Sequence, residues 1–251
     1  MLVPALLGWP YARLEPELRK AFEVALHAGT ALALTIALRA EVAGVASELD
    51  ARRALGAALA LVPAAAAGSL LERPIEARLG APRQVAIAQM VAGLALVAGD
   101  RAPATRRYED AGLLDHLVLG LAQAVALVPG VSRNGATLTA ARARRLDRPA
   151  ASRLSRHAAL PVIVGAAALK GGRLIRAGLP SELRAPFAAG FAAAALSTLA
   201  ARGLLARMAG ARSYAPLGAY RVVLGAFACA RLRRPTSCAA ESAARFASMA
   251  S

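Results

Sequence analysis

The sequence is poor in the residues on which several common architectures depend. Only two of its 251 residues are cysteine, Cys229 and Cys238, and their spacing fits neither a metal site nor a disulfide framework. Aromatic residues make up 4% of the chain and charged residues 18%, whereas 57% is hydrophobic. A small domain held together by disulfides is therefore excluded, and so is a protein with an ordinary charged surface.

Acidic residues are also scarce, with 15 Asp and Glu against 31 Lys and Arg, which gives a formal net charge of +16. A nucleic-acid partner would favour a basic stripe interleaved with aromatic side chains, and the sequence has none, so no nucleic acid is expected. In membrane proteins, basic residues form short clusters in the loops between apolar runs, where they set the topology and contact anionic lipid headgroups. The clustered arginines are 52 and 53, then 101, 106 and 107, then 142, 144 and 145, and finally 231, 233 and 234.

What the chain does have is a series of long apolar runs. Each is close to the roughly 17–25 residues that a helix needs to cross a bilayer. A soluble alanine-rich helical protein is the alternative, but its helices should carry a polar face at a period of 3.6 residues, and the run 54–71 has none. The uncharged runs are 54–71, 84–99, 117–132 and 185–201, while 21–38 holds one Glu and one His and 214–230 one Arg.

These runs predict an all-α fold, a polytopic membrane helical bundle. One integral-membrane domain is expected over residues 1–231, followed by a polar, poorly ordered tail over 232–251. Helices are predicted near 20–39, 54–72, 83–100, 112–128, 157–170, 185–209 and 214–231.

Residues 129–156 break this pattern, because they contain seven arginines and cannot span a bilayer. Pro129 and Gly130 are expected to end the preceding helix, and the side chain of Ser132, Asn134 or Thr137 to cap a new one. The sequence therefore predicts a broken or re-entrant helix. The later arginines of the stretch, Arg142 among them, are expected to be solvated.

Two segments share a pattern of a charged start, a histidine and a long apolar end. They are KAFEVALHAGTALALTIAL (20–38) and SRLSRHAALPVIVGAAAL (152–169). Membrane proteins with a site at a repeat interface are often built from inverted repeats, so this similarity predicts one here.

The turn VPGVSRNGAT (128–137) holds groups suited to an anion. A helix that starts near Ser132 would present free backbone N–H groups and the positive end of its dipole. Arg133 adds a planar set of donors that matches phosphate oxygens, and Ser132, Asn134 and Thr137 add hydroxyl and amide groups. Gly130 and Gly135 would let a ligand approach the backbone. The turn thus predicts a phosphate or diphosphate site; the alternative is a capping serine beside an arginine that reaches to lipid headgroups.

This turn resembles the second signature of the undecaprenyl-diphosphatase family, the bacitracin-resistance type of membrane phosphatase. That signature reads Pro-Gly-x-Ser-Arg-Ser-x-x-Thr, and residues 129–137 depart from it at one position, where Asn134 replaces the second serine. An asparagine still donates and accepts hydrogen bonds but offers no hydroxyl nucleophile. Further segments similar to the family are 21–34, 113–133, 150–169 and 214–227.

The resemblance implies an enzyme of the bacterial cell membrane that hydrolyses undecaprenyl diphosphate to undecaprenyl phosphate and inorganic phosphate. This reaction recycles the lipid carrier of cell-wall synthesis and confers bacitracin resistance. Arg133 and Ser132 would be its catalytic residues, and Gly130, Asn134, Gly135 and Thr137 would bind substrate. A divalent metal, Mg²⁺ or Ca²⁺, is implied, with ligands that this chain does not identify. Partners would be the prenyl diphosphate, membrane lipids and, as a further option, a second copy of the chain.

The family's first signature, an acidic stretch followed by Pro-x-Ser-Ser-x-Gly-His, does not occur in the sequence. LVPALLGWP (2–10) resembles the family segment that comes directly after that signature, so we expect the natural chain to begin upstream of residue 1. Glu23 and His27 are secondary site candidates. A non-catalytic membrane protein that binds prenyl diphosphate, or a transporter, is the alternative function; phosphate release would separate it from the phosphatase.

Overall fold

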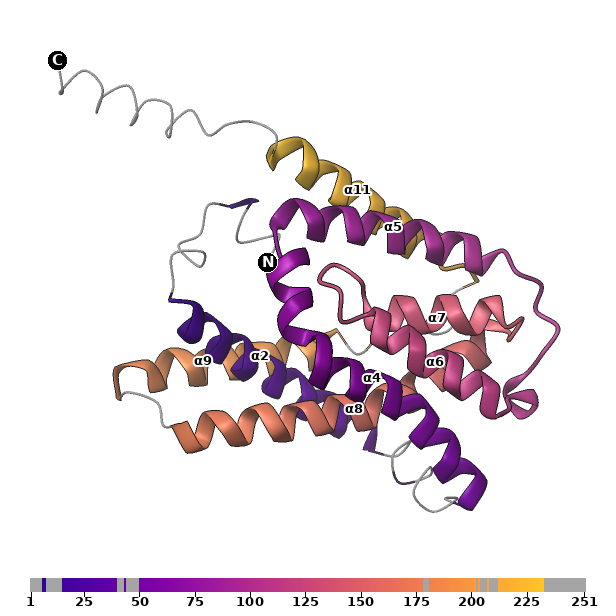
Figure 1. The fold of residues 1–251 in the computed structure, drawn as a ribbon, viewed down its shortest axis with the longest axis horizontal. Helices are drawn as coiled ribbons and strands as arrows, with labels where there is room; N and C mark the ends of the chain where they lie inside the picture. The colour runs from indigo at the N-terminus through magenta and orange to yellow at the C-terminus, as the bar shows by residue number, and fades with distance from the viewer. Residues whose placement is uncertain are drawn as a thin grey trace.

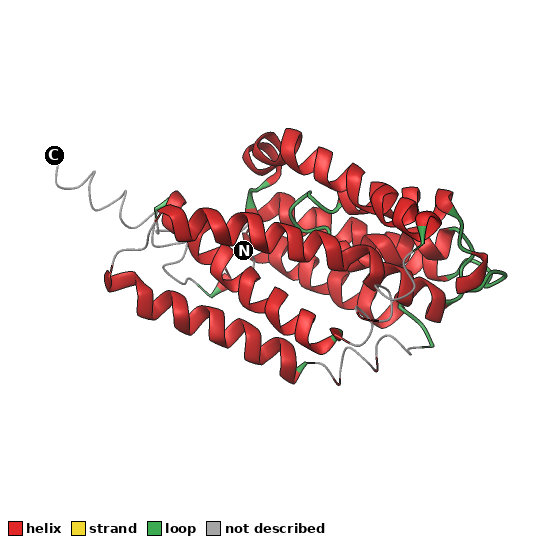
Figure 2. Ribbon diagram, turned by 90° about the horizontal axis from the view of Figure 1, so that it is seen from below, coloured by secondary structure: helices red, strands yellow, loops and turns green. Residues whose placement is uncertain are grey.

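A computed structural model describes residues 6–7, 15–39, 43, 50–177, 181–201, 203, 207 and 212–232. Every regular element in these ranges is a helix, as Figure 2 shows, so the predicted all-α bundle is confirmed. The elements in chain order are α2 (Pro16–Ala37), α4 (Ala51–Leu79), α5 (Pro82–Asp100), η2 (Tyr108–Asp110), α6 (Leu113–Val125), α7 (Arg133–Ala143), α8 (Arg148–Ala177), α9 (Ser181–Ala200) and α11 (Ala215–Leu232).

Three of the described helical segments are long and apolar enough to cross a membrane: Ala51–Leu71, Pro82–Asp100 and Leu183–Ala200. Their large apolar side chains point outward, and Leu70, Val91 and Leu196 are each at least 60% exposed. In water such surfaces would be unfavourable, whereas lipid tails solvate them. The helix predicted near 112–128 is α6, which ends at Val125, three residues earlier than expected, and the chain then bends into a turn.

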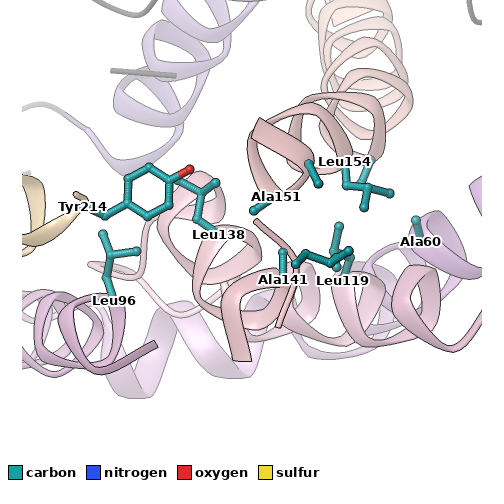
Figure 3. Packing of buried hydrophobic residues seen from close by; sticks show 11 residues of the cluster. Ala60, Leu96, Leu119, Leu138, Ala141, Ala151, Leu154 and Tyr214 are labelled. Atoms are coloured by element: carbon teal, nitrogen blue, oxygen red, sulfur yellow. The ribbon is translucent and has the colours of Figure 1, made fainter. Parts of the chain in front are cut away.

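The two short helices α6 and α7 lie between α5 on one side and α4 and α8 on the other. In Figure 1, α5 lies alongside α11, while α2 packs against α8 and α9 on the other side of α4. Side chains from α4, α5, α6, α7 and α8 meet Tyr214 in one core, seen in Figure 3. Its buried members are Ala60, Leu96, Leu119, Leu138, Ala141, Leu146, Ala150, Ala151, Leu154, Ala158 and Tyr214.

Helices α6 and α7 form a re-entrant hairpin. At 1.5 Å per residue their 13 and 11 residues are about 20 and 17 Å long, short of the roughly 30 Å hydrocarbon core. They pack against each other, and their turn, residues 126–132, lies far from the arginine-rich loops that precede α6 and follow α7. The broken helix predicted at Pro129–Gly130 is therefore confirmed.

The packing of the helices also follows the pattern of an inverted repeat. If α2, α4 and α5 correspond to α8, α9 and α11, a twofold axis maps the α2–α9 contact onto α8–α4. It maps the contacts α5–α11 and α2–α8 onto themselves. All four contacts are present. Helices α5 and α11 run antiparallel, since Gly218 lies by Gly93 and Gly225 by Ala86. This arrangement supports the repeat that the similarity of 20–38 and 152–169 predicts.

Helix α8 begins earlier than expected, at Arg148 rather than near residue 157. The side chain of Asp147 accepts a hydrogen bond from the N–H of Ala150 at 2.8 Å and so caps the first turn. Pro149 follows within that turn, where a missing N–H costs nothing. The arginines in the first turns of α8 do not prevent helix formation, because they lie at the arginine-rich end of the bundle rather than in its apolar middle.

Arg142 was expected to be solvated, and that prediction is wrong. The residue is 1% exposed, in the last turn of α7. Its guanidinium donates to the carbonyl oxygens of Leu146, Asp100 and Ala102, and its Nε lies 3.6 Å from the Asp100 carboxylate. Arg142 thus joins the end of α5, the loop after it and the turn between α7 and α8. A cation that satisfies carbonyl groups at a helix C-terminus is favourable both as a donor and toward the helix dipole.

Arg142→Ala is therefore expected to destabilise the protein, by about 3–5 kcal/mol, because it leaves buried carbonyl groups and part of the Asp100 charge without a donor. Arg101→Ala is the matched control, since that side chain is exposed, and we expect it to unfold at the wild-type temperature. Thermal unfolding of both variants in detergent, followed by size-exclusion chromatography, measures the difference. Equal melting temperatures for the two variants would show that the contacts of Arg142 contribute nothing.

The predicted tail 232–251 lies outside the described residues from position 233 onward, and so does most of the predicted helical extension 201–209.

Candidate functional site

The turn between α6 and α7 has the local structure that its sequence predicts. Gly130 adopts φ +99°, a left-handed conformation that glycine accepts at little cost. A Cβ at this position would stand 2.2 Å from the carbonyl oxygen of Val85 in α5, so the turn also packs closely. Both observations assign Gly130 to the geometry of the turn rather than to the approach of a ligand.

Ser132, one of the three residues predicted to cap the new helix, is the N-cap of α7. Its Oγ accepts a hydrogen bond from the N–H of Gly135 at 3.3 Å, and its carbonyl accepts from the N–H of Ala136 at 2.8 Å. No hydrogen bond within the described part of the chain takes up the N–H of Arg133 or Asn134. The first turn of α7 therefore keeps backbone donors and a serine hydroxyl proton available to an anion.

Arg133 follows Ser132 and is half-buried. Among the described residues, no hydrogen-bond acceptor and no carboxylate pairs with its guanidinium. An arginine group normally stays charged in proteins, so within the described chain this one is a desolvated cation without a counter-ion. An anionic ligand at the start of α7 would supply that partner.

Asn134 and Thr137 meet a residue to which the sequence assigned no role. The hydroxyl of Ser155 in α8 donates to Oδ1 of Asn134 at 2.9 Å and lies 2.6 Å from Oγ1 of Thr137. Thr137 and Ser155 are each 1% exposed, whereas Asn134 is exposed. The three side chains therefore link α7 to α8, with Asn134 at the surface end. The predicted contact of Thr137 with phosphate stays a prediction, and its hydroxyl is engaged in this link.

Glu23 and His27 lie elsewhere in the bundle. Both belong to α2, which packs mainly against α8 and α9. His27 is exposed, with Nδ1 2.7 Å from the carbonyl oxygen of Glu23, one helical turn away. Gly135, by contrast, belongs to the site region by its position in the first turn of α7, where a Cβ would meet only Ser132, at 3.4 Å or more.

Two aspartates that the sequence did not single out anchor the arginine-rich end of the hairpin. Asp115 in α6 accepts hydrogen bonds from Arg106 at 2.7 and 3.0 Å and from Arg144 at 2.8 Å. Burial would raise the pKa of Asp115, but these hydrogen bonds, with one from the N–H of Gly112, hold it well below its usual range. Asp100 likewise accepts from Arg148 at 2.7 Å and from Ser213 at 2.9 Å. The start of α6 and the segment that follows α7 are thus fixed to the bundle by these ion pairs and hydrogen bonds.

Arg221 is the single charge in the apolar run 214–230, and the sequence alone gave it no role. The structure brings it to the turn, where Nη2 donates to the carbonyl oxygen of Gly130 at 2.7 Å. Arg221 therefore lies at the same turn as Arg133, although the two arginines are far apart in the sequence.

A divalent metal was implied by the resemblance, and the described residues identify no ligand set for it. They contain no group of three or more His, Cys, Asp or Glu side chains that could hold one. The carboxylates of Asp100 and Asp115 are already engaged by arginines. The groups that the site offers to an anion are backbone N–H, hydroxyl and guanidinium groups.

Comparison with known proteins gives matches that cover most of the chain. The family model described as "Bacitracin resistance protein BacA" matches residues 1–227. The chain is 37% identical over 238 residues to the undecaprenyl-diphosphatase of Geobacter sulfurreducens, which covers 90% of this chain and 86% of that protein. It is also 37% identical to the one from Gemmatimonas aurantiaca, over 89% of this chain and 85% of that protein. The chain belongs to the BacA family of bacitracin resistance proteins.

Proposed function

We propose that this protein hydrolyses undecaprenyl diphosphate to undecaprenyl phosphate and inorganic phosphate. Its BacA family membership and its relatives named undecaprenyl-diphosphatase support this activity. Removing the terminal phosphate returns the lipid carrier to cell-wall synthesis and lowers the amount of the diphosphate that bacitracin sequesters. The protein is a multi-pass integral protein of the bacterial cell membrane, where its lipid substrate resides.

The single observation that carries the site assignment is the guanidinium of Arg133, unpaired within the described chain, beside the N-terminus of α7. A diphosphate bound there would receive a forked pair of hydrogen bonds from Arg133 and further bonds from the N–H groups of Arg133 and Asn134. The hydroxyl of Ser132 would donate to the same phosphate while its oxygen continues to cap the helix.

The catalytic role of these groups is electrostatic. In phosphoryl transfer the charge spreads over the equatorial oxygens of the transferring group, and preorganised donors stabilise it. Because the turn lies within the bundle and away from the arginine-rich loops, such donors act with little competition from water. Arg133 and Ser132 would therefore stabilise the transition state. Asn134 and Gly135 would position the substrate from the same turn, and Gly130 would shape it.

A divalent cation and a homodimer remain parts of this proposal that the resemblance implies. Mg²⁺ is often held by substrate phosphates with only one or two carboxylates, so it does not require the three-residue cluster that the described residues lack. Chelation followed by addition of Mg²⁺ or Ca²⁺ tests the dependence on metal, and cross-linking in native membranes tests the dimer.

Release of inorganic phosphate from undecaprenyl diphosphate by the purified protein in detergent tests the proposed function. We expect turnover with the prenyl diphosphate and little with water-soluble diphosphates, because the apolar surface of the bundle favours a lipid substrate. Measuring binding of the same lipid by thermal shift separates the alternatives. Binding without phosphate release would overturn the phosphatase assignment in favour of a binding protein or transporter.

A further inference from the structure

Arg221 lies where a charged side chain is costly. It is in α11, seven residues beyond Tyr214, and so about 10 Å along the helix from the arginine-rich end of the bundle. The neighbouring positions Tyr220 and Val223 are exposed and suited to lipid. A charge within an apolar helix usually marks a functional position that faces the bundle interior. Arg221 fits that description, because its side chain is half-buried and directed to the α6–α7 turn.

The backbone that carries Arg221 is held firmly. Helices α5 and α11 approach so closely at Gly93 and Gly218 that a Cβ on Gly93 would stand 2.8 Å from the carbonyl oxygen of Gly218. In addition, Nε2 of Gln89 in α5 donates to the carbonyl oxygen of Arg221 at 3.3 Å. Figure 1 shows the two helices side by side over most of their length. The backbone of Arg221, from which its side chain extends, is therefore fixed relative to α5.

The head group of Arg221 makes one hydrogen bond within the described chain, to the turn. Nη2 donates to the Gly130 carbonyl at 2.7 Å, while the buried Nε has no hydrogen-bond partner among the described residues. Gly130 is the left-handed residue of the turn and stands two positions before the N-cap Ser132. Its peptide orientation fixes the direction in which α7 starts, and hence where Arg133 points.

We propose that Arg221 is a positioning residue of the phosphate site. By holding the carbonyl oxygen of Gly130, Arg221 fixes the α6–α7 turn against α5 and α11. Ser132 and Arg133 are then aligned before the lipid diphosphate binds. This proposal deepens the phosphatase function and rests on it. A displacement of about 1 Å in a group that contacts the reacting phosphate lowers turnover by roughly 10²-fold, so loss of this hydrogen bond should be visible in kcat.

The test compares Arg221→Ala, Arg221→Lys and the control Arg231→Ala. Arg231 lies in the last turn of the same helix, exposed and stacked on Phe227 at 5.2 Å. We expect Arg221→Ala to lower kcat by roughly 10²-fold with a smaller change in KM. Arg221→Lys should recover to within about tenfold of wild type, since one ammonium donor can replace one hydrogen bond. Arg231→Ala should equal wild type; an equal loss at Arg231 would overturn the proposal.

Combination with Arg133→Ala separates positioning from direct contact. If Arg221 acts through Arg133, the double variant should be little slower than Arg133→Ala alone. If the two effects multiply and Arg221→Lys does not recover, Arg221 binds the phosphate itself and the positioning role is wrong.

A measurement without substrate keeps this inference distinct from the proposed function. Hydrogen–deuterium exchange over residues 126–134 should be faster in Arg221→Ala than in wild type, with unchanged exchange over the arginine-rich loop 101–112. Unchanged exchange in 126–134 would overturn the positioning role even in an active enzyme. Faster exchange there in a protein that releases no phosphate would overturn the phosphatase function and leave the structural role of Arg221 intact.

Discussion

Arg133→Ala is expected to lower kcat/KM for undecaprenyl diphosphate by roughly 10²–10³-fold, the scale for the loss of one preorganised donor to a developing charge. The reason is that Arg133 is half-buried and has no carboxylate partner within the described residues, so its donors are available to a ligand rather than used by the fold. Because no group in the described part of the chain depends on the guanidinium, the variant should keep the wild-type melting temperature. Steady-state phosphate release and thermal unfolding in detergent measure the two quantities.

Arg133→Lys should recover little of this activity, because a point charge cannot reproduce two parallel hydrogen bonds to phosphate oxygens. Arg107→Ala is the matched control, since its side chain is exposed at the arginine-rich end of the bundle, and it should keep full activity. Arg142 does not serve as a control, because it is buried and structural. Similar losses for Arg133→Ala and Arg107→Ala would show that the arginines act only by attracting anionic lipids.

Gly130→Ala is expected to affect both the fold and the activity. A non-glycine residue at φ +99° is strained, and the new Cβ would overlap the Val85 carbonyl oxygen at 2.2 Å. We expect the protein to lose about 2 kcal/mol or more of stability. Because the turn must move to relieve the overlap, Ser132 and Arg133 move with it, and kcat should fall by roughly 10²-fold.

Gly135→Ala is the matched control for stability. A Cβ there would make only ordinary contacts, at 3.4 Å to Cβ and 3.7 Å to Oγ of Ser132, and alanine favours a helix. The melting temperature of this variant should equal or exceed that of wild type. If Gly130→Ala melts at the temperature of Gly135→Ala, the turn is not constrained in the way that its left-handed residue implies.

Several boundaries of the fold could be predicted from the sequence because their causes are local. The expected helices 83–100 and 214–231 match α5 and α11 within one residue, since apolar runs bounded by proline or charge define them. The cap of α7 by Ser132 was also predictable, because that hydrogen bond joins residues three positions apart. The early start of α8 carried a local signal as well, the capping Asp147 before Pro149, which the density of arginines hid.

Contacts between distant parts of the chain could not be predicted in the same way. The Arg142–Asp100 hydrogen bond joins residues 42 positions apart, and Arg221–Gly130 joins residues 91 apart. Before the fold is known, Arg142 cannot be told from its exposed neighbour Arg145, since both stand in the same basic stretch. Ser155 is hidden for the same reason, because its link to Asn134 and Thr137 depends on how α8 crosses α7.

The sequence alone determined that the chain is an apolar helical bundle with a broken helix at Pro129–Gly130 and a new helix that starts at Ser132, and it predicts an anion site at that start. Periodicity, capping and the preferences of proline and glycine act within about four residues, so they can be recognised from the sequence alone. Only the tertiary structure decided which arginines form hydrogen bonds or ion pairs with other helices and which have no such partner within the described chain. That distinction depends on where carbonyl and carboxylate oxygens from other helices lie. Arg142 meets such oxygens in a buried network, Arg221 meets the carbonyl of the turn, and Arg133 meets none within the described chain.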